Sequence, residues 1–280
     1  MHLNFDEQEV DKSLYDMKRY GRDSPLVPFF PTSCMDCPKP HVGNGPCCSI
    51  HSRSAFTPTI AEGNEQSQAK QDATQILYES DEVLSQYLSM HYGPHPDALL
   101  QEGGMIQASL EAPRRAAEQL AAWAKRSGLP LGRVLDLGCA VGRSTFELAS
   151  PSCGFSEAVG VDISVRFVEV ANKLRECRRM DYDLRVEGEV SERVTAALED
   201  GIDTSRVRFV HGDACALPLD LGTFDAVLAA NVLDRVPDPA KLLGQIAASL
   251  RSGGVAMLTS PFSWSDNYTN KTNWIGGTYK

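Results

Sequence analysis

A glycine-rich turn in the middle of the chain is the first place where residue types and spacing suggest chemistry. An apolar run from Arg133 to Leu137 is followed by Gly138, Ala140 and Gly142. Gly138 permits a tight turn, Ala140 keeps its position small, and Gly142 lets the next helix begin close to a ligand. The pattern predicts a site for a nucleotide-type ligand. Its spacing, Asp-x-Gly-x-Ala-x-Gly, differs from the G-x-G-x-x-G fingerprint and disfavours NAD.

Acidic residues follow the next two predicted strands. Asp162 lies where a carboxylate can accept hydrogen bonds from both hydroxyls of a ribose. Asp213 could accept one from an adenine amino group, and the amide of Ala214 could donate one to a ring nitrogen. A single Asp after a strand is more often a cap or turn residue. Because ligands bind at the carboxyl ends of strands in such sheets, the three motifs in order predict one site.

Other residues near the predicted strand ends have two interpretations each. Asp136 would orient an amino group of the ligand or satisfy backbone amides of the glycine turn. Asn231 and Asp234 follow the fourth strand, where they could orient a second substrate. Asp234 and Arg235 could bind its amino and carboxylate groups, or form an ordinary surface ion pair.

Aromatic residues at both ends of the folded region are candidates for covering the site. They are Tyr92, next to His91, and Trp264 and Trp274 near the C-terminus. Aromatic residues at helical spacing are more often core residues, so packing is the alternative for each of them.

The elements that must position these residues follow from the hydrophobic pattern. After Gly132, short apolar runs alternate with helical segments, which predicts an α/β fold with a mostly parallel sheet and helices on both faces. The segment from Met180 to Ser205 is long for a connection, so we expect an extra helix there. We expect strands at 133–137, 157–161, 207–211, 226–229 and 255–260, and helices near 143–149, 164–178, 190–198 and 239–250.

The chain divides into three regions. Residues 1–74 are interrupted by prolines and predict a largely irregular extension. Residues 75–132 contain two helical patterns, one ending at Gly93 and one at 112–127, which we expect to pack on the domain over residues 133–280. Cysteines of the extension half meet a zinc pattern, but a cysteine-bearing linker is the stronger interpretation and no metal is assigned (Cys34, Cys37, Cys47 and Cys48).

Composition narrows the choice of partner and compartment. A formal net charge of -10 and a pI near 5.1 disfavour nucleic acid and anionic membranes as partners. The chain has no run of about 20 apolar residues and no secretory signal at its N-terminus. We expect a cytoplasmic protein acting on a small molecule, with free thiols at Cys139, Cys153, Cys177 and Cys215. Nothing in the sequence sets an oligomeric state.

Taken together, the motifs resemble those of the class I S-adenosylmethionine methyltransferases. The resemblance rests on 136–142, Asp162, 212–214 and 224–227. It implies a Rossmann-like fold, S-adenosylmethionine as cofactor and a small-molecule methyl acceptor. The implied cofactor residues are Asp136, Gly138, Cys139, Ala140, Gly142, Asp162, Ile163, Asp213, Ala214 and Asn231. Asn231 and Asp234 are the predicted catalytic residues, and Tyr92, Arg235 and Trp264 the predicted substrate-binding residues.

A closer resemblance is to the methyltransferase module of the ovothiol biosynthesis enzymes, which methylates a ring nitrogen of mercaptohistidine. Segments 87–93, 136–148, 187–189, 230–236, 260–264 and 274–277 carry it. It implies N-methylation of an imidazole. Nothing in the chain resembles the iron-dependent sulfoxide synthase that precedes this module, so we expect methylation only.

Two further expectations concern the end of the chain and the competing functions. Class I methyltransferases usually finish with an antiparallel hairpin, and because twenty residues follow Ser260 we expect this sheet to lack it. The alternatives are a class I enzyme with another small acceptor, a noncatalytic remnant of the cofactor fold and, least favoured, a dinucleotide oxidoreductase.

Overall fold

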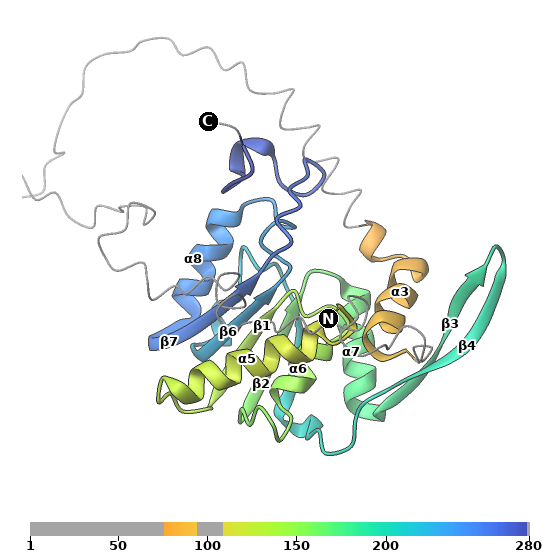
Figure 1. Cartoon of the computed structure of the whole chain (residues 1–280), viewed down its shortest axis with the longest axis horizontal. Helices are drawn as coiled ribbons and strands as arrows, with labels where there is room; N and C mark the ends of the chain where they lie inside the picture. The colour runs from red at the N-terminus through yellow and green to blue at the C-terminus, as the bar shows by residue number, and fades with distance from the viewer. Residues whose placement is uncertain (1–75, 94–108, 279–280) are drawn as a thin grey trace, which may run out of the picture.

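A computed structural model describes residues 76–93 and 109–278. In this part of the chain, a five-stranded sheet in the order β5-β2-β1-β6-β7 is flanked by helices (Figure 1). Neighbouring strands of this sheet pair in parallel. The predicted Rossmann-like α/β fold with a mostly parallel sheet is confirmed. The strands are β1 Arg133–Leu137, β2 Glu157–Asp162, β5 Val207–His211, β6 Phe224–Ala230 and β7 Leu250–Thr259.

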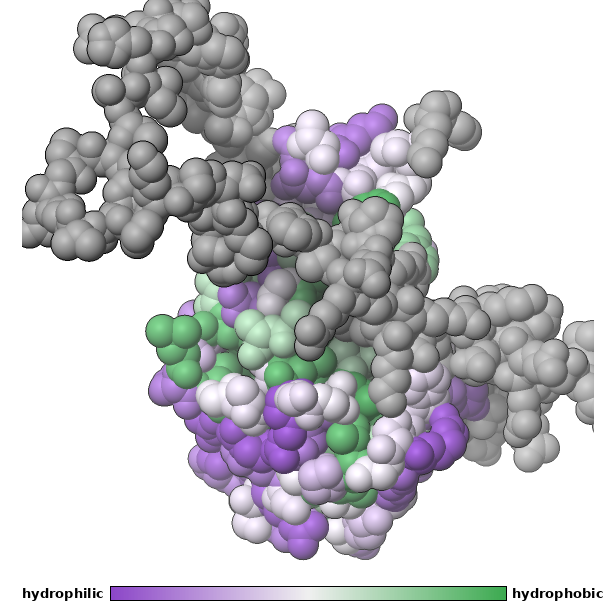
Figure 2. Space-filling model, turned by 90° about the vertical axis from the view of Figure 1, so that its left-hand side faces the viewer, coloured by the Kyte–Doolittle hydropathy of each residue, from purple (hydrophilic) through white to green (hydrophobic). Residues whose placement is uncertain are grey.

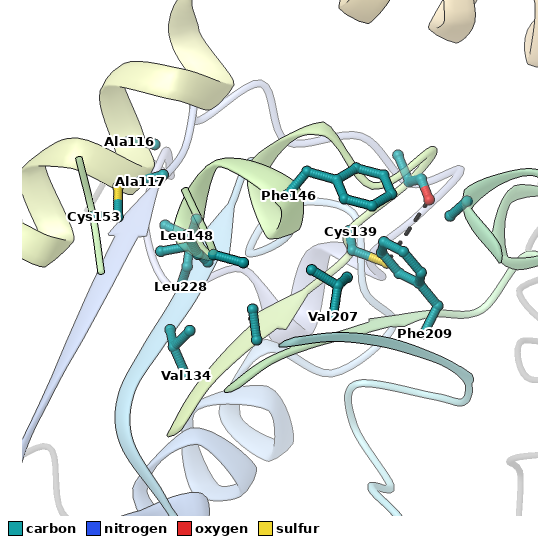
Figure 3. Close-up of a cluster of buried hydrophobic side chains, with 14 of the residues drawn as sticks. Ala116, Ala117, Val134, Cys139, Phe146, Leu148, Cys153, Val207, Phe209 and Leu228 are labelled. Atoms are coloured by element: carbon teal, nitrogen blue, oxygen red, sulfur yellow. Dashed lines mark hydrogen bonds between the residues drawn. The ribbon is translucent and has the colours of Figure 1, made fainter. Parts of the chain in front are cut away.

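Helices cover both faces of the sheet, so its central strands are buried on both sides as parallel strands usually are. Alternate residues of β1 show the division, because Val134 packs against the cluster under α5, α6 and α7 whereas Leu135 packs against the cluster under α8. Figure 3 shows the first cluster, with Phe146 and Phe209 in edge contact at 5.2 Å between ring centroids. The helices are α3 Asp81–Tyr92, α5 Ala112–Arg126, α6 Arg143–Leu148, α7 Val165–Cys177 and α8 Pro239–Ser249.

Side-chain caps explain where three of these helices begin. The Ser164 hydroxyl accepts a hydrogen bond from Phe167 N at the start of α7, and Ser80 accepts one from Val83 N at the start of α3. Asp238 caps α8 in the same way and is followed by Pro239 at the first helical position. Each cap satisfies an amide that the helix itself leaves without a partner.

The helix predicted near 190–198, and with it the extra helix between Met180 and Ser205, is wrong. This segment is an antiparallel ribbon of β3 Arg179–Glu187 and β4 Val190–Ala197, with Gly188 in the turn at φ +54°. In the register, Tyr182 lies opposite Val194 and Met180 opposite Ala196, so one face of the ribbon is apolar. Tyr182 and Ala196 are buried in the cluster that includes Leu88 of α3. A period of two residues in Met180, Tyr182 and Leu184 therefore decides for strands.

The last described residues fold back over the carboxyl end of β6 (Figure 1). The Thr269 hydroxyl donates to Val236 O at 2.6 Å, and the indole N–H of Trp274 donates to Thr269 O at 2.8 Å. Within the described residues, the outer edge of β7 pairs with no further strand.

The face of the molecule in Figure 2 mixes polar and apolar patches, and its lower part is predominantly hydrophilic. Among the helices of residues 76–93 and 109–278, none combines the length and apolar character that crossing a membrane requires.

Candidate functional site

The glycine turn after β1 has a backbone shape that residues with a side chain rarely adopt. Gly138 has φ +69°, and a Cβ added to it would lie 2.3 Å from Val232 Cγ2. Gly142 has φ +88°, and its added Cβ would lie 2.6 Å from Phe209 Cζ. The amides of Gly138 and Cys139 both donate to Val161 O, which ties the turn to the end of β2. Both glycines are therefore required by space as well as by conformation.

Asp162 connects the glycine turn to the start of α7. Its Oδ2 accepts a hydrogen bond from Ala140 N at 2.8 Å, and its Oδ1 accepts one from Ser164 N at 2.9 Å. Burial raises the pKa of the carboxyl group, and these backbone hydrogen bonds oppose that rise. Ala140 is held at φ +46°, a strained conformation for a residue with a side chain. The carboxylate is thus fixed in place before any ligand binds.

Asp136 lies beneath the turn and is fully buried. Its Oδ2 accepts hydrogen bonds from the hydroxyls of Ser144 at 2.7 Å and Thr145 at 2.6 Å. Burial raises the pKa of Asp136 to about 6, although both hydroxyls act in the opposite direction. These contacts join β1 to α6, and Asp136 does not line the cavity described next.

A cavity of about 420 Å³ lies at the carboxyl ends of the strands. This volume is in the range of small-molecule sites. The Asp213 carboxylate accepts a hydrogen bond from the Cys215 backbone amide at 2.8 Å and so shapes the loop after β5. Most predicted cofactor residues line this cavity, namely Gly138, Cys139, Ala140, Asp162, Ile163, Asp213, Ala214 and Asn231.

The opposite wall of the cavity comes from α3, the residues before it and the start of α5. Tyr87 packs against Phe167 of α7 with 4.8 Å between ring centroids, and Tyr78 lies 6.0 Å from the same ring. Tyr87, Met90 and His91 line the cavity from one face of α3. Tyr78, Tyr87 and Phe167 were not among the site residues predicted from the sequence, although the spacing of 87, 90 and 91 marks one helical face.

Two predicted substrate-binding residues lie outside the cavity wall. The hydroxyl of Tyr92 donates to Val141 O at 3.0 Å, so this side chain supports the glycine turn from behind. Trp264 stacks on Trp274, with 6.1 Å between ring centroids and an interplanar angle of 23°. Both rings therefore act in packing, which was the alternative interpretation.

The loop after β6 places its polar residues differently from the prediction. Asn231 lines the cavity at φ +58°, and its backbone N–H donates to Thr259 O at 2.8 Å. Asp234 does not line it, since the side chain has 0% exposure and its Oδ2 accepts from Ser263 N at 2.8 Å and from Arg235 at 2.9 Å. Asp234 therefore holds the C-terminal segment and orients Arg235, which corrects its assignment as a catalytic residue.

Arg235 does line the cavity. Its guanidinium carbon lies 4.7 Å from the ring centroid of Tyr268, and one terminal nitrogen donates to the Ser263 hydroxyl at 2.8 Å. Burial raises the pKa of the phenols of Tyr78 and Tyr87, which also line the cavity, and the charge of Arg235 acts weakly in the opposite direction. A guanidinium and phenolic groups thus converge at this end of the cavity.

No cluster of three or more His, Cys, Asp or Glu in the described ranges could hold a metal ion. The cysteine pattern of the N-terminal extension lies outside those ranges. Cys139, Cys153, Cys177 and Cys215 are free thiols.

The chain is similar to known proteins over this region. Residues 135–258 match a family model described as a methyltransferase domain. A demethylmenaquinone methyltransferase of Lactococcus lactis subsp. lactis is 28% identical over 122 residues, which are 43% of this chain and 38% of that protein. A ubiquinone biosynthesis O-methyltransferase of Xanthomonas campestris pv. campestris is 28% identical over 139 residues, 49% of this chain and 46% of that protein. The chain thus spans less than half the length of these two relatives.

The solved structures that this chain resembles have lower sequence identities to it. Magnesium protoporphyrin IX methyltransferase from Synechocystis PCC 6803 is 19% identical, covers 64% of this chain and 67% of its own, and has a TM-score of 0.41. A glycopeptide N-methyltransferase complexed with S-adenosylmethionine is 19% identical, with coverage of 51% and 53% and a TM-score of 0.37.

Proposed function

Because residues 135–258 form a class I S-adenosylmethionine-dependent methyltransferase domain, we propose that the chain is an enzyme that methylates a nitrogen of a small molecule. One observation carries the proposal. The glycine turn, Asp162 and Asp213 come from three different strand ends and line a single cavity. Ligands of open parallel sheets bind at this edge.

The residues present fit the cofactor. Asp162 already accepts hydrogen bonds from two backbone amides. A carboxylate has further lone pairs, which could accept hydrogen bonds from the ribose hydroxyls. Asp213 and the Ala214 amide would bind the adenine, beside Ile163. The glycine turn from 138 to 142 would then hold the amino-acid end. When bound, S-adenosylmethionine supplies an electrophilic methyl group on a positively charged sulfur.

For the acceptor we propose the imidazole ring of a mercaptohistidine. Two of the segments that resemble the ovothiol enzymes, 87–93 and 230–236, contribute cavity residues from opposite walls. Asn231 would orient the ring, and Arg235 would bind the carboxylate of the amino acid. Methyl transfer is an in-line displacement, so the protein contributes mainly positioning and exclusion of water.

The test begins with calorimetric titration of the purified chain with S-adenosylmethionine, followed by addition of 5-thiohistidine and mass spectrometry of the product. We expect binding and a product heavier by one methyl group. Asp162→Asn should weaken cofactor binding roughly tenfold or more, since a hydrogen bond to a charged group contributes about 1.5–3 kcal/mol. Asp220→Asn, an exposed carboxylate outside the cavity, is the matched control. Absence of cofactor binding would refute the proposal.

A second acceptor class is favoured by a specific feature, the aromatic wall of Tyr78, Tyr87 and Phe167. A flat ring of the kind implied by the names of the curated relatives, such as demethylmenaquinone, would stack there. The same assay with a short-chain demethylmenaquinone analogue separates the two acceptors by product mass. Cofactor binding without transfer to either acceptor would instead favour a noncatalytic remnant.

A further inference from the structure

The residues just before α3 are hydrogen-bonded to the start of α7. The Glu79 carboxylate accepts hydrogen bonds from Val165 N at 2.9 Å and from Arg166 N at 3.2 Å. Beside them, the Ser164 hydroxyl donates to Tyr78 O at 3.3 Å. Two segments 86 residues apart in the sequence are thus joined next to the cavity.

Arg166 of α7 adds two further contacts to the same segment. Its guanidinium donates to Glu79 O at 3.1 Å and forms an ion pair with Asp81. We call residues 78–81 the strap. Because backbone and side-chain atoms of the strap are both bonded, its place at the start of α7 is well defined.

Glu79 completes the capping of α7, which has a local cap already. Ser164 accepts a hydrogen bond from the amide of Phe167. The two amides before it would be left without partners by the helix, and Glu79 binds both of them. A negative charge is also favourable at a helix N-terminus. A residue from outside the helix therefore supplies part of the cap, and its bonds attach the strap to α7.

The attachment places Tyr78 beside the predicted ribose ligand. Tyr78 lines the cavity together with Asp162 and Phe167. Its ring makes edge contacts with Phe167, at 6.0 Å between centroids, and with Tyr87, at 6.4 Å. Ser164, which donates to Tyr78 O, also donates its backbone amide to the Asp162 carboxylate. The strap and the ribose ligand therefore share one bonded neighbour.

Tyr78 also approaches the C-terminal segment on the other side of the cavity. Burial raises the pKa of its phenol, and the neighbouring phenols of Tyr87 and Tyr268 act in the same direction. The ring of Tyr268 lies 4.7 Å from the guanidinium carbon of Arg235, which lines the cavity. Tyr78 thus extends from the cofactor end of the cavity, at α7, toward the end where Arg235 lies.

We propose that Glu79 is a positioning residue that holds the ring of Tyr78 over bound S-adenosylmethionine. This role rests on the proposed function. With the ribose on Asp162, the strap covers one side of the cofactor, and release requires the strap to leave α7. A site that is complete in only a fraction of the molecules binds its ligand more weakly by that fraction. Glu79 therefore controls cofactor affinity and release without contacting the cofactor.

The experiment compares wild type with Glu79→Ala and Glu79→Gln. Calorimetry measures the affinity for S-adenosylmethionine, and a chase with excess S-adenosylhomocysteine measures the release of radiolabelled cofactor. We expect Glu79→Ala to leave the strap closed in about one molecule in ten, and so to bind about tenfold more weakly and release faster. Glu79→Gln keeps one acceptor oxygen and should lose less. In the cofactor-free chain, the amides of Val165 and Arg166 should exchange faster in both variants.

Two control variants separate this role from charge and from stability. Glu82→Gln makes the same change of charge at an exposed position of α3 and should match wild type. Asp203→Ala removes a cap and an ion pair at the amino end of β5, away from the cavity. It should lower the melting temperature and leave cofactor affinity unchanged.

A double-mutant cycle tests whether Glu79 acts through Tyr78. Tyr78→Ala should itself weaken cofactor binding, and Glu79→Ala should add little in that background. At saturating cofactor, the kcat for transfer to 5-thiohistidine should stay within about threefold of wild type in Glu79→Ala, because binding rather than chemistry is affected.

The possible outcomes are distinguishable. A wild-type chain that does not bind S-adenosylmethionine overturns the proposed function itself. Wild-type binding with unchanged affinity and release in both Glu79 variants overturns the role of Glu79 alone. Strict additivity of Glu79→Ala and Tyr78→Ala, or an equal loss of affinity in Asp203→Ala, also overturns it.

Discussion

Replacing Gly138 by alanine should destabilise the fold more than the same change at another glycine of similar conformation. Gly138 and Gly128 have φ values of +69° and +67°, so alanine is strained by about 1–2 kcal/mol at both positions. At Gly128 the added Cβ meets nothing within 4 Å, whereas at Gly138 it would lie 2.3 Å from Val232 Cγ2. Gly128→Ala therefore isolates the backbone strain.

The extra cost at Gly138 is the collision with Val232. Overpacking of a well-filled site costs about 1–3 kcal/mol, so Gly138→Ala should exceed Gly128→Ala by about 2 kcal/mol. For a domain of this size that difference corresponds to a melting temperature lower by about 4–8 °C. Urea unfolding and thermal scans of both variants measure it. Cofactor affinity should also fall in Gly138→Ala, because the turn must move.

A double-mutant cycle tests the cause. Val232→Ala removes the methyl group that the new Cβ meets, so Gly138→Ala should be less costly in the Val232→Ala background by about 1 kcal/mol or more. Equal destabilisation by Gly138→Ala and Gly128→Ala, or strict additivity with Val232→Ala, would show that the collision is relieved without cost and refute the reasoning.

Three other predictions concern buried groups. The folded-state pKa of Asp136 is raised to about 6 from 3.8, so protonation of this group stabilises the fold fully below pH 3.8, and the stabilisation is lost as pH rises through 6. The free energy of unfolding, measured by urea titration, should therefore fall less between pH 4 and 7 in Asp136→Asn than in wild type. Asp234→Ala should release the C-terminal segment at a cost of about 3–5 kcal/mol, because it leaves Arg235 and Ser263 without their partner; a shift in tryptophan emission from Trp264 and Trp274 should accompany it, and unchanged emission would contradict this account. Tyr182→Ala should cost about 3 kcal/mol and speed amide exchange in β3 and β4 before the main sheet, whereas exchange that rises uniformly would argue against a separately anchored ribbon.

Patterns in the sequence correctly predicted those features of the fold that depend on neighbouring residues or on the order of strands and helices. Strand and helix alternation predicts a parallel sheet because crossover connections require it. The turn of Gly138 and the acids at Asp162 and Asp213 follow strand ends in order, and in the folded chain all three line one cavity.

The segment around β3 and β4 shows where a local pattern is ambiguous. Residues 190–198 contain apolar positions compatible with either a helix or a strand. The alternation of Met180, Tyr182 and Leu184 in the preceding residues was the better signal. It becomes decisive only because α3, far away in the sequence, supplies the surface on which the apolar face of the ribbon is buried.

The amino-acid sequence by itself determined the sheet, the glycine turn and the chemistry available at the strand ends, since these depend on neighbours along the chain. The tertiary structure alone decided which polar and aromatic groups face the cavity. Asp234 and Arg235 are adjacent in sequence, yet the first is fully buried against Ser263 and the second lines the cavity. His91 and Tyr92 divide in the same way. Side chains one residue apart point in different directions, and only long-range packing determines which of them faces the cavity.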